Sequence, residues 1–396
     1  MRYFYLLMLF WLSNPIAGQV STRNYIRTRT MLNETGSSYM DLIVYYDGLG
    51  RPFQTVFKGI TPSNQNLVSL QEFDEMGRES KSWLPVVSTS DYVAAGDFIS
   101  NAPGSYNNDS RPYYQSVYEF SPLNRMVQQY GPGVAWHSGH SVTTEYLVNT
   151  TISPLNCINY SVNSSGSLVN NGNYASSRLY VTKTIDEDDN IGYAFIDKLE
   201  RVVLTRQMKD NVPHDTYYVY DDYGNLSFVL QPMYQDNKNL SLYAFQYKYD
   251  ERNRCVEKKQ PGAETVKYVY DMTDKLVFSQ DGNQRALGQW TFYLYDKFLR
   301  LTVAGVCNNA NTASASSSTV TCTYVTSNGG LGNSGYFSSF VLTTPIIHQV
   351  NYYDNYDFRS LTGFTNISYF PAALVDAKGR QTGSIITVLG LSLIHI

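Results

Sequence analysis

The chain has few of the residues that most often carry out chemistry. Among its 396 residues there are 5 histidines and 4 cysteines, and charged residues make up 16% of the total. It contains no G-x-S-x-G nucleophile turn, phosphate-binding loop, H-E-x-x-H zinc helix or dinucleotide-binding glycine pattern. The net charge is −4, and because lysine and arginine are scattered there is no basic stripe for nucleic acid. The composition therefore predicts no enzyme, no cofactor, no metal centre and no nucleic-acid partner.

Long apolar runs are also missing. The longest N-terminal run, Tyr3 to Leu12, is too short to cross a bilayer, and so is the C-terminal stretch from Ile385. Arg2 precedes the first run, and the small-residue segment Pro15 to Gly18 follows it, which is typical of a cleaved secretory signal. We expect residues 1–18 to be that signal, with an uncleaved anchor as the alternative. The prediction is a protein secreted or held at the cell surface, without a membrane span.

Tyrosine, by contrast, is abundant, with 35 residues, and it recurs in one pattern. The clearest copies of Tyr-x-Tyr-Asp are residues 218–221, 268–271 and 293–296. Side chains alternate across a strand, so the two tyrosines lie on one face, and the following aspartate suits a tight turn. Since no stretch shows sustained helical periodicity, we expect a nearly all-β chain built from such hairpins.

Ten turns fit this frame when the pattern is followed along the chain. In eight of them the residue three places after the turn's start is Gly, Asn or Asp, which tolerate a positive φ. Glu200 and Leu299 break this rule, so we expect those two turns to be built differently. The turns begin at Asp47, Asp74, Ser121, Asp197, Asp221, Asp250, Asp271, Asp296, Asp354 and Asp376.

An arginine often stands four residues after the turn's start, where it can return to the carboxylate. It could form a solvated surface pair, contributing about 0–1 kcal/mol, or a partly buried pair that fixes the strand register. Asn225, Lys275 and Phe358 replace it in three turns. The arginines are Arg51, Arg78, Arg125, Arg201, Arg254, Arg300 and Arg380.

These Tyr-x-Tyr-Asp-x-x-x-Arg lines resemble the Rhs, or YD-repeat, proteins over roughly residues 24–385. The resemblance implies stacked antiparallel hairpins that form part of a coiled, solenoid-like β-shell. It also implies a partner, the protein's own C-terminal toxin-like effector domain, which is absent from this sequence. The opening lines, residues 45–52 and 72–78, are similar to the N-terminal region of secreted bacterial members.

The expected organisation has four parts. After the signal, residues 19–190 form an irregular β-rich region with early repeats and long loops, including a Ser/Asn/Gly-rich surface loop over 88–116. Residues 191–390 form the repeat array, interrupted by an Asn/Ala/Ser-rich flexible loop over 308–318. Residues 391–396 match a sequencing adapter translated in one frame and are expected to be an artefact.

Three smaller features allow a specific and an ordinary interpretation. His137 and His140 could ligate zinc, but nearby ligands are lacking, and hydrogen-bonded imidazoles fit better. The cluster Asp186 to Asn190 could bind calcium, although a polar turn fits its spacing better. Cys307 and Cys322 could form a disulfide in an exported chain, contributing about 3 kcal/mol, or remain small buried thiols.

Two functions follow from these observations. The first is a non-enzymatic scaffold, part of a shell that encases or presents the C-terminal effector. The second is a cell-surface adhesin whose tyrosine-rich face or polar loops bind carbohydrate or a surface protein. In the second case aromatic rings would stack on sugars; in the first they would pack within the sheet.

Overall fold

The structure is a computed structural model that describes residues 23–33, 35–308, 310–325, 329–361 and 377–387. The expected signal at 1–18, Asp376 and the segment 391–396 lie outside the described residues. Within the described part, 22 strands belong to one antiparallel sheet, and two further pairs of strands form small sheets. The predicted all-β fold is confirmed.

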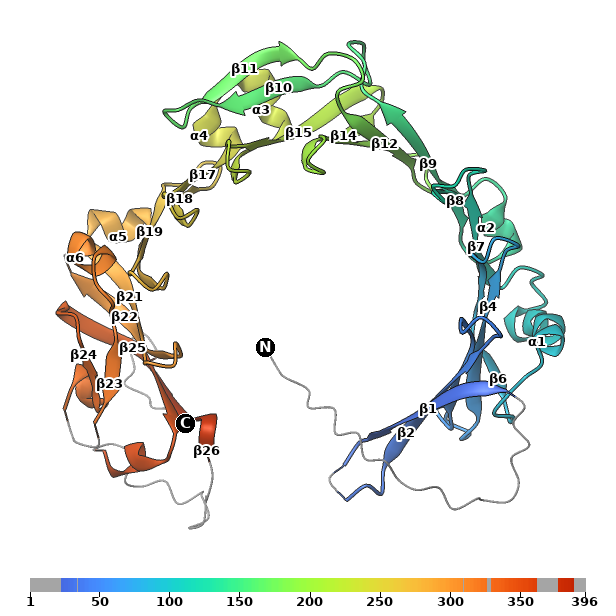
Figure 1. Ribbon diagram of the computed structural model, residues 1–396, viewed down its shortest axis with the longest axis horizontal. Helices are drawn as coiled ribbons and strands as arrows, with labels where there is room; N and C mark the ends of the chain where they lie inside the picture. Colours follow the sequence, from blue (N-terminus) through green and yellow to red (C-terminus); the bar gives the residue numbers. More distant parts are fainter. Residues whose placement is uncertain (1–22, 34, 309, 326–328, 362–376, 388–396) are drawn as a thin grey trace. The chain divides into compact units, whose positions relative to one another are not determined.

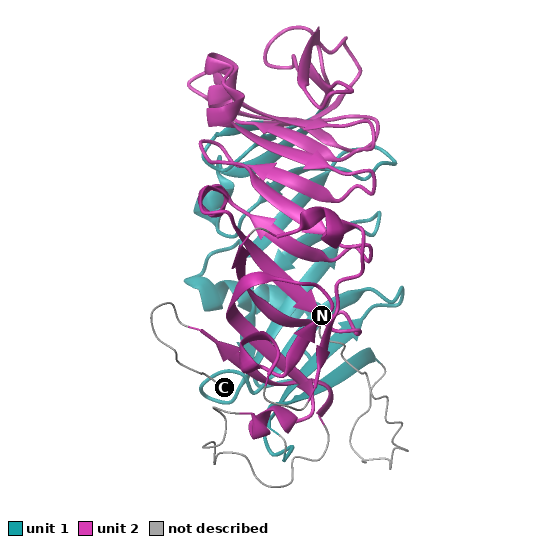
Figure 2. Ribbon diagram, turned by 90° about the vertical axis from the view of Figure 1, so that its left-hand side faces the viewer, with its two compact units in different colours: residues 1–146, 182–192 teal, residues 147–181, 193–396 magenta. Residues whose placement is uncertain are grey.

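The chain divides into two compact units (Figure 2). Unit 1 consists of residues 1–146 and 182–192, and unit 2 of residues 147–181 and 193–396. Residues 147–181, which we expected in the N-terminal region, therefore group with the repeat array.

Unit 1 is a series of neighbouring antiparallel strands. Most pairs consecutive in sequence are hydrogen-bonded to each other, as in β1–β2, β2–β3 and β7–β8. Its elements are β1 (Asn24–Met31), β2 (Tyr39–Tyr46), β3 (Pro52–Lys58), β4 (Asn66–Phe73), β5 (Glu79–Trp83), β6 (Val86–Ser88), α1 (Ala95–Asn101), η1 (Ala102–Tyr106), β7 (Tyr113–Tyr118), β8 (Met126–Tyr130), α2 (Val134–His137) and most of β9 (Ser141–Val148) and β12 (Tyr180–Ile185).

The core of unit 1 follows from alternation along the strands. Ile43 on β2, Val56 on β3 and Val68 on β4 are almost fully buried, and their sequence neighbours are not. Helix α1 lies against this sheet and adds Phe98 to the same core (Figure 1). The prediction of a plain surface loop over 88–116 is wrong, because Phe98 supplies an apolar contact that holds the short helix α1 on the sheet.

Unit 2 continues the pattern with longer regularity. Its elements are β10 (Ile158–Val162), β11 (Leu168–Asn173), β13 (Ile191–Ile196), β14 (Val202–Lys209), β15 (Val212–Tyr220), β16 (Leu226–Leu230), α3 (Pro232–Asn237), α4 (Leu240–Tyr243), β17 (Ala244–Tyr249), β18 (Cys255–Lys259), β19 (Val266–Tyr270), β20 (Leu276–Gln280), α5 (Gly282–Ala286), β21 (Gln289–Tyr295), β22 (Leu301–Asn308), α6 (Thr312–Ser316), β23 (Cys322–Tyr324), η2 (Leu331–Asn333), β24 (Tyr336–Ser338), β25 (Thr343–Asp354), η3 (Asp357–Ser360) and β26 (Ala377–Ile386).

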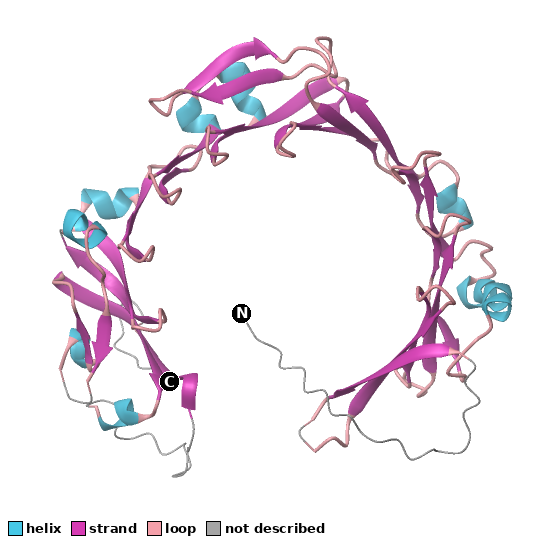
Figure 3. Ribbon diagram, in the orientation of Figure 1, coloured by secondary structure: helices cyan, strands magenta, loops and turns pink. Residues whose placement is uncertain are grey.

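From β14 to β22 each strand of unit 2 pairs with the next in antiparallel register. Helices α3 to α6 lie on one face of these strands, and the hairpin loops bend toward the other (Figure 3). On β15 the buried Tyr217 and Val219 alternate with the more exposed Tyr218 and Tyr220. The alternation places the two tyrosines of a Tyr-x-Tyr-Asp line on the same face.

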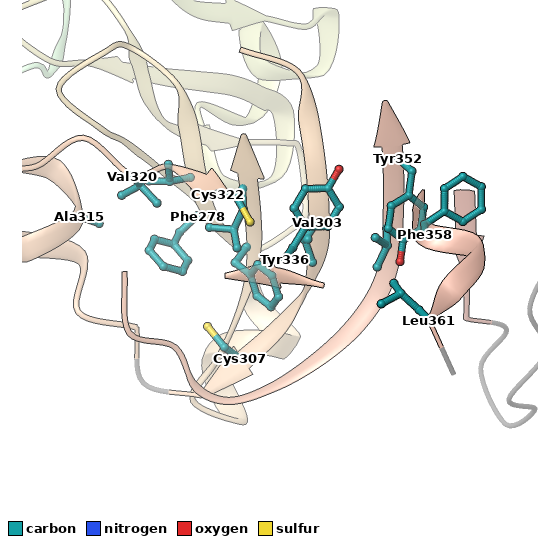
Figure 4. Close-up of a cluster of buried hydrophobic side chains, with 14 residues drawn as sticks. Phe278, Val303, Cys307, Ala315, Val320, Cys322, Tyr336, Tyr352, Phe358 and Leu361 are labelled. Atoms are coloured by element: carbon teal, nitrogen blue, oxygen red, sulfur yellow. The ribbon is translucent and has the colours of Figure 1, made fainter. Parts of the chain in front are cut away.

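The segment between β22 and β25, which we call the excursion, packs against the sheet. Its α6 buries Ala315, and β23 and β24 add Cys322 and Tyr336 to a cluster that includes Tyr352 (Figure 4). The expectation of a flexible loop over 308–318 is therefore wrong for the described residues. The apolar contacts of Ala315 and Val320 with the cluster hold this segment in place, although its composition is typical of a loop.

Of the two alternatives for the cysteines, a disulfide or buried thiols, the structure has buried thiols. Cys307 and Cys322 are both free thiols, each almost fully buried in that cluster. Burial raises the pKa of both thiols to about 11. They act as small apolar residues, the ordinary interpretation of buried cysteine.

Candidate functional site: carboxylate turns and the arginine–aromatic ladder

Most of the repeat turns are organised by the carboxylate of their first residue. In the first, Asp47 N–H donates to the Arg51 carbonyl (3.0 Å), and Gly50 N–H donates to the Asp47 carbonyl (3.1 Å). Asp47 Oδ1 accepts the backbone N–H groups of Leu49 and Arg51, both at 2.9 Å. The carboxylate thus satisfies two donors that the tight loop leaves without a strand partner.

The same arrangement recurs in both units. The i+4 carbonyl accepts from the turn's first N–H, and the first carboxylate accepts from residues i+2 and i+4, in the turns that begin at Asp74, Asp186, Asp197, Asp221, Asp250, Asp271 and Asp296. Asp186 was the start of the possible calcium loop. Its oxygens instead accept the backbone N–H groups of Asp188 and Asn190 and the Asn190 amide.

Two turns correct our expectation. Glu200 (φ 61°) and Leu299 (φ 70°) occupy the left-handed position in turns with the standard hydrogen bonds. We expected them to be built differently because neither residue favours a positive φ. The stabilisation from the four hydrogen bonds of each turn exceeds the conformational cost of one left-handed residue, about 1–2 kcal/mol. The turn therefore holds this residue at a positive φ.

The structure also shows turns that our sequence frame missed. Asn163 and Thr61 start turns of the same type, with an amide or hydroxyl oxygen in place of the carboxylate. At Ser121 the carboxylate comes from Glu119, two residues earlier, which binds Arg125 through two hydrogen bonds of 2.8 Å. Arg125, together with Ser121, lowers the pKa of Glu119 to about 2. A side-chain oxygen followed by Gly or Asn at i+3 would have identified Asn163 and Thr61.

The arginine at i+4 binds its own turn's aspartate. Its Nε donates to the second carboxylate oxygen at 2.7–2.8 Å in the turns of Asp47, Asp74, Asp197, Asp250 and Asp296. These side chains are partly buried: the exposed fraction is 13–24% for the aspartates and 19–31% for the arginines. The Arg78 backbone N–H and guanidinium hold the pKa of Asp74 below its usual range. The pairs are therefore partly buried rather than fully solvated.

Each arginine also reaches the next repeat. Its guanidinium carbon lies over the aromatic ring that immediately precedes the next turn's carboxylate. The distances to the ring centroid are 4.2 Å for Arg51–Phe73, 4.6 Å for Arg78–Tyr118, 4.8 Å for Arg201–Tyr220, 5.1 Å for Arg254–Tyr270 and 4.4 Å for Arg300–Tyr353. One cation thus joins a turn to the following hairpin.

Many of the same tyrosines return a hydrogen bond to the preceding repeat. Tyr220 donates its hydroxyl to the Val202 carbonyl (3.0 Å), and Tyr353 donates to Leu301 (2.9 Å). In both cases the acceptor is the residue that follows the arginine. Tyr118, Tyr146 and Tyr249 donate in the same way to Glu79, Met126 and Leu226. We call this set of contacts the arginine–aromatic ladder.

The Asp271 turn deviates in an informative way. Asp271 is fully buried, and its carboxylate accepts the Thr273 hydroxyl and the backbone N–H of Val320, from the excursion after β22. Lys275 Nζ lies 5.4 Å from the Tyr295 ring centre and has no hydrogen-bond partner among the described residues. The excursion supplies the contact that arginine makes elsewhere.

The predicted turn at Asp354 is wrong. Asp354 itself has the positive φ (69°), and Asp357 begins η3 instead of closing a hairpin. The Asp354 carboxylate accepts hydrogen bonds from both terminal nitrogens of Arg300, at 2.9 and 2.6 Å. It also accepts one from the Gly379 N–H, at 2.7 Å. Phe358, which replaces the arginine, is buried in the core, so this chain segment cannot return as a repeat strand. Arg380 is exposed on β26, and Asp376 lies outside the described residues.

The two histidines stack on aromatic rings. His137 lies 4.2 Å from Tyr130, and His140 lies 4.7 Å from Trp136 between ring centres. His140 Nδ1 is 2.8 Å from the Glu187 carbonyl oxygen. Among the described residues no three His, Cys, Asp or Glu side chains gather in a way that could hold a metal ion. The described helices also include none that is long and apolar enough to cross a membrane.

Relieving the strain at Leu299 should stabilise the protein. We expect Leu299→Gly to raise the free energy of unfolding by roughly 0.5–1 kcal/mol, because glycine adopts a positive φ without cost. Leu287 is the matched control, since it is as exposed as Leu299 (69% against 65%) but has φ −95°. Leu287→Gly should destabilise the protein in the same urea titration. Equal effects of both substitutions would contradict the assigned turn.

Acid should weaken unit 2 through Asp354. Its pKa is lowered to about 2, first by the hydrogen bonds from Arg300 and then by Gly379 N–H. A carboxyl with a lowered folded pKa stabilises above its unfolded pKa of about 4, and that stability is lost as pH falls toward 2. We expect Asp354→Asn to flatten this part of the profile of urea midpoint against pH. Asp222→Asn, at an exposed turn position, should leave the profile unchanged; a matching change would refute the assignment.

Comparisons with known proteins agree with this geometry at the level of the fold. Residues 19–148 match a family described as a domain of unknown function, DUF6443. The crystal structure of TcdB2-TccC3-TEV is similar with a TM-score of 0.52 and 13% identity, covering 88% of this chain and 14% of that one. The crystal structure of TcdB2-TccC3 without hypervariable C-terminal region is similar with a TM-score of 0.49 and 13% identity. That match covers 81% of this chain and 14% of the other. No curated protein matches the chain. The chain thus spans about a seventh of these structures and shares the β-sheet fold of the first.

Proposed function

We propose that this chain is a non-enzymatic exported scaffold, a section of an Rhs/YD-repeat β-shell that encases or presents a C-terminal toxin-like domain. The observation that carries the proposal is the arginine–aromatic ladder. In this ladder the recurring polar groups of the hairpin motif, which are the carboxylate, the guanidinium and the tyrosine hydroxyl, join one hairpin to the next.

The charged side chains of the turns already have hydrogen-bond partners within the protein, which supports a structural role. Asp296 accepts the backbone N–H groups of Phe298 and Arg300 and the Arg300 guanidinium. Arg300 in turn binds Asp354. A carboxylate used in this way has little capacity left to act as a base or nucleophile. The repeats therefore resemble supports for a sheet more than an active site.

The turn tips supply a surface for a second polypeptide. In six turns the residue at position i+2 is a large apolar side chain that makes none of the turn's hydrogen bonds and is strongly exposed. They are Leu49, Met76 and Leu123 in unit 1, and Leu199, Tyr223 and Phe298 in unit 2. Turns of neighbouring hairpins lie two strand spacings, about 10 Å, apart. Regularly spaced exposed apolar side chains favour contact with another segment of protein.

Export and the effector domain complete the proposal. The sequence pattern of residues 1–18 supports secretion, and the resemblance to Rhs proteins supports a C-terminal effector. The fold shared with the TcdB2-TccC3 structure supports a β-scaffold. Together they favour a container or platform.

The test is limited proteolysis of the protein translated from the complete natural reading frame. We expect its C-terminal segment to be cleaved slowly in the natural protein. Replacing Leu199, Tyr223 and Phe298 with serine should speed that cleavage by roughly tenfold or more, because the apolar contacts are lost.

The matched control replaces Val212, Leu242 and Leu287 with serine, three exposed apolar residues of unit 2 outside these tips. Cleavage should stay slow in this variant. A C-terminal segment cleaved as fast in the natural protein as in isolation would overturn the proposal, as would a reading frame with no further domain.

A further inference from the structure

A groove of unit 2 lies beside the first turn of the repeat array, and Asp197 and Arg201 of that turn line part of it. It has a volume of about 490 Å³. Asn173 and Tyr174, at the end of β11, line it together with Arg178, Leu179 and Lys198. Lys198 belongs to the Asp197 turn, so the groove joins the β10–β11 hairpin region to the start of the repeat array.

The charges of the groove do not cancel. Its only carboxylate among the lining residues, Asp197, is bound by Arg201 at 2.7 Å and by two backbone N–H groups. Arg178 and Lys198 are both exposed, and neither side chain has an ion pair or hydrogen bond among the described residues. Two uncompensated cations therefore face one groove in a chain of net charge −4.

The rest of the lining is apolar or neutral polar. Leu199 is strongly exposed and Tyr174 is partly buried, and these two side chains give the groove its apolar surface; Leu179 beneath is almost fully buried. The amides of Asn159 and Asn173 lie along the groove and can both donate and accept hydrogen bonds. The lining thus combines an apolar surface, amides and two cations.

We propose that this groove binds an acidic saccharide, a chain of sugar rings that carry carboxylates. The C–H face of a ring packs on Tyr174 and Leu199, its hydroxyls pair with the asparagine amides, and its carboxylate binds Arg178 and Lys198. An acidic peptide would use the two cations but has no array of hydroxyls for the amides. This activity goes beyond the scaffold role. The groove shares Leu199 with the apolar turn tips, and the variants that test saccharide binding leave Leu199 unchanged.

The experiment is calorimetric titration of the full chain with a galacturonic acid tetrasaccharide. We expect saturable binding that weakens as salt rises, because exposed charges are screened. The methyl-esterified tetrasaccharide, which lacks the charge, should bind at least tenfold more weakly. A double variant, Arg178→Gln with Lys198→Gln, should lose a similar factor.

The matched control changes the same charge elsewhere: Lys209→Gln with Lys267→Gln, both exposed, with Lys209 at the opposite end of β14 from the groove. It should bind within twofold of the natural chain. Four results would overturn the proposal: no binding, equal binding of the ester, equal loss in the control variant, or equal binding of a tetraglutamate peptide. Thermal melting of both variants separates lost binding from lost fold.

Discussion

The structure depends on how a tight hairpin loop satisfies its own backbone. A loop of three residues leaves N–H groups without strand partners, and in eight turns one aspartate oxygen accepts two of them. Because the carboxylate is charged, these hydrogen bonds are stronger than those of a neutral acceptor. The turn is therefore stable enough to hold residues such as Glu200 and Leu299 in a left-handed conformation. Everything else in the repeat is arranged around that carboxylate.

The arginine at i+4 connects the turn's carboxylate to the next hairpin. Its guanidinium binds the aspartate with Nε and lies over the following aromatic ring, as Arg201 does between Asp197 and Tyr220. The tyrosine hydroxyl then donates back to the carbonyl after the arginine. An isolated hairpin is marginal in water, so such contacts between neighbours are what make a repeat array stable.

The sequence predicts the all-β fold because Tyr-x-Tyr-Asp combines strand alternation with a turn residue. It also locates most turns, since Asp at i and Gly or Asn at i+3 serve one hydrogen-bond pattern. Prediction from the sequence fails where a contact with a residue far away in the chain determines the local structure. Asp354 looks like a turn, but its oxygens bind Arg300 and Gly379, and Phe358 enters the core. Asp271 is buried by a segment 49 residues away. Neither partner can be identified from local spacing.

The ladder requires that consecutive repeats are energetically coupled, and a double-mutant cycle on Arg201 and Tyr220 measures that coupling. The free energy of unfolding is measured for Arg201→Met, Tyr220→Leu and the pair, with Arg201 and Tyr270, two repeats further on, as the uncoupled reference. The ladder predicts a coupling of about 0.5–1.5 kcal/mol for the first pair and none for the second. Additive effects in the first pair, within about 0.3 kcal/mol, would contradict it.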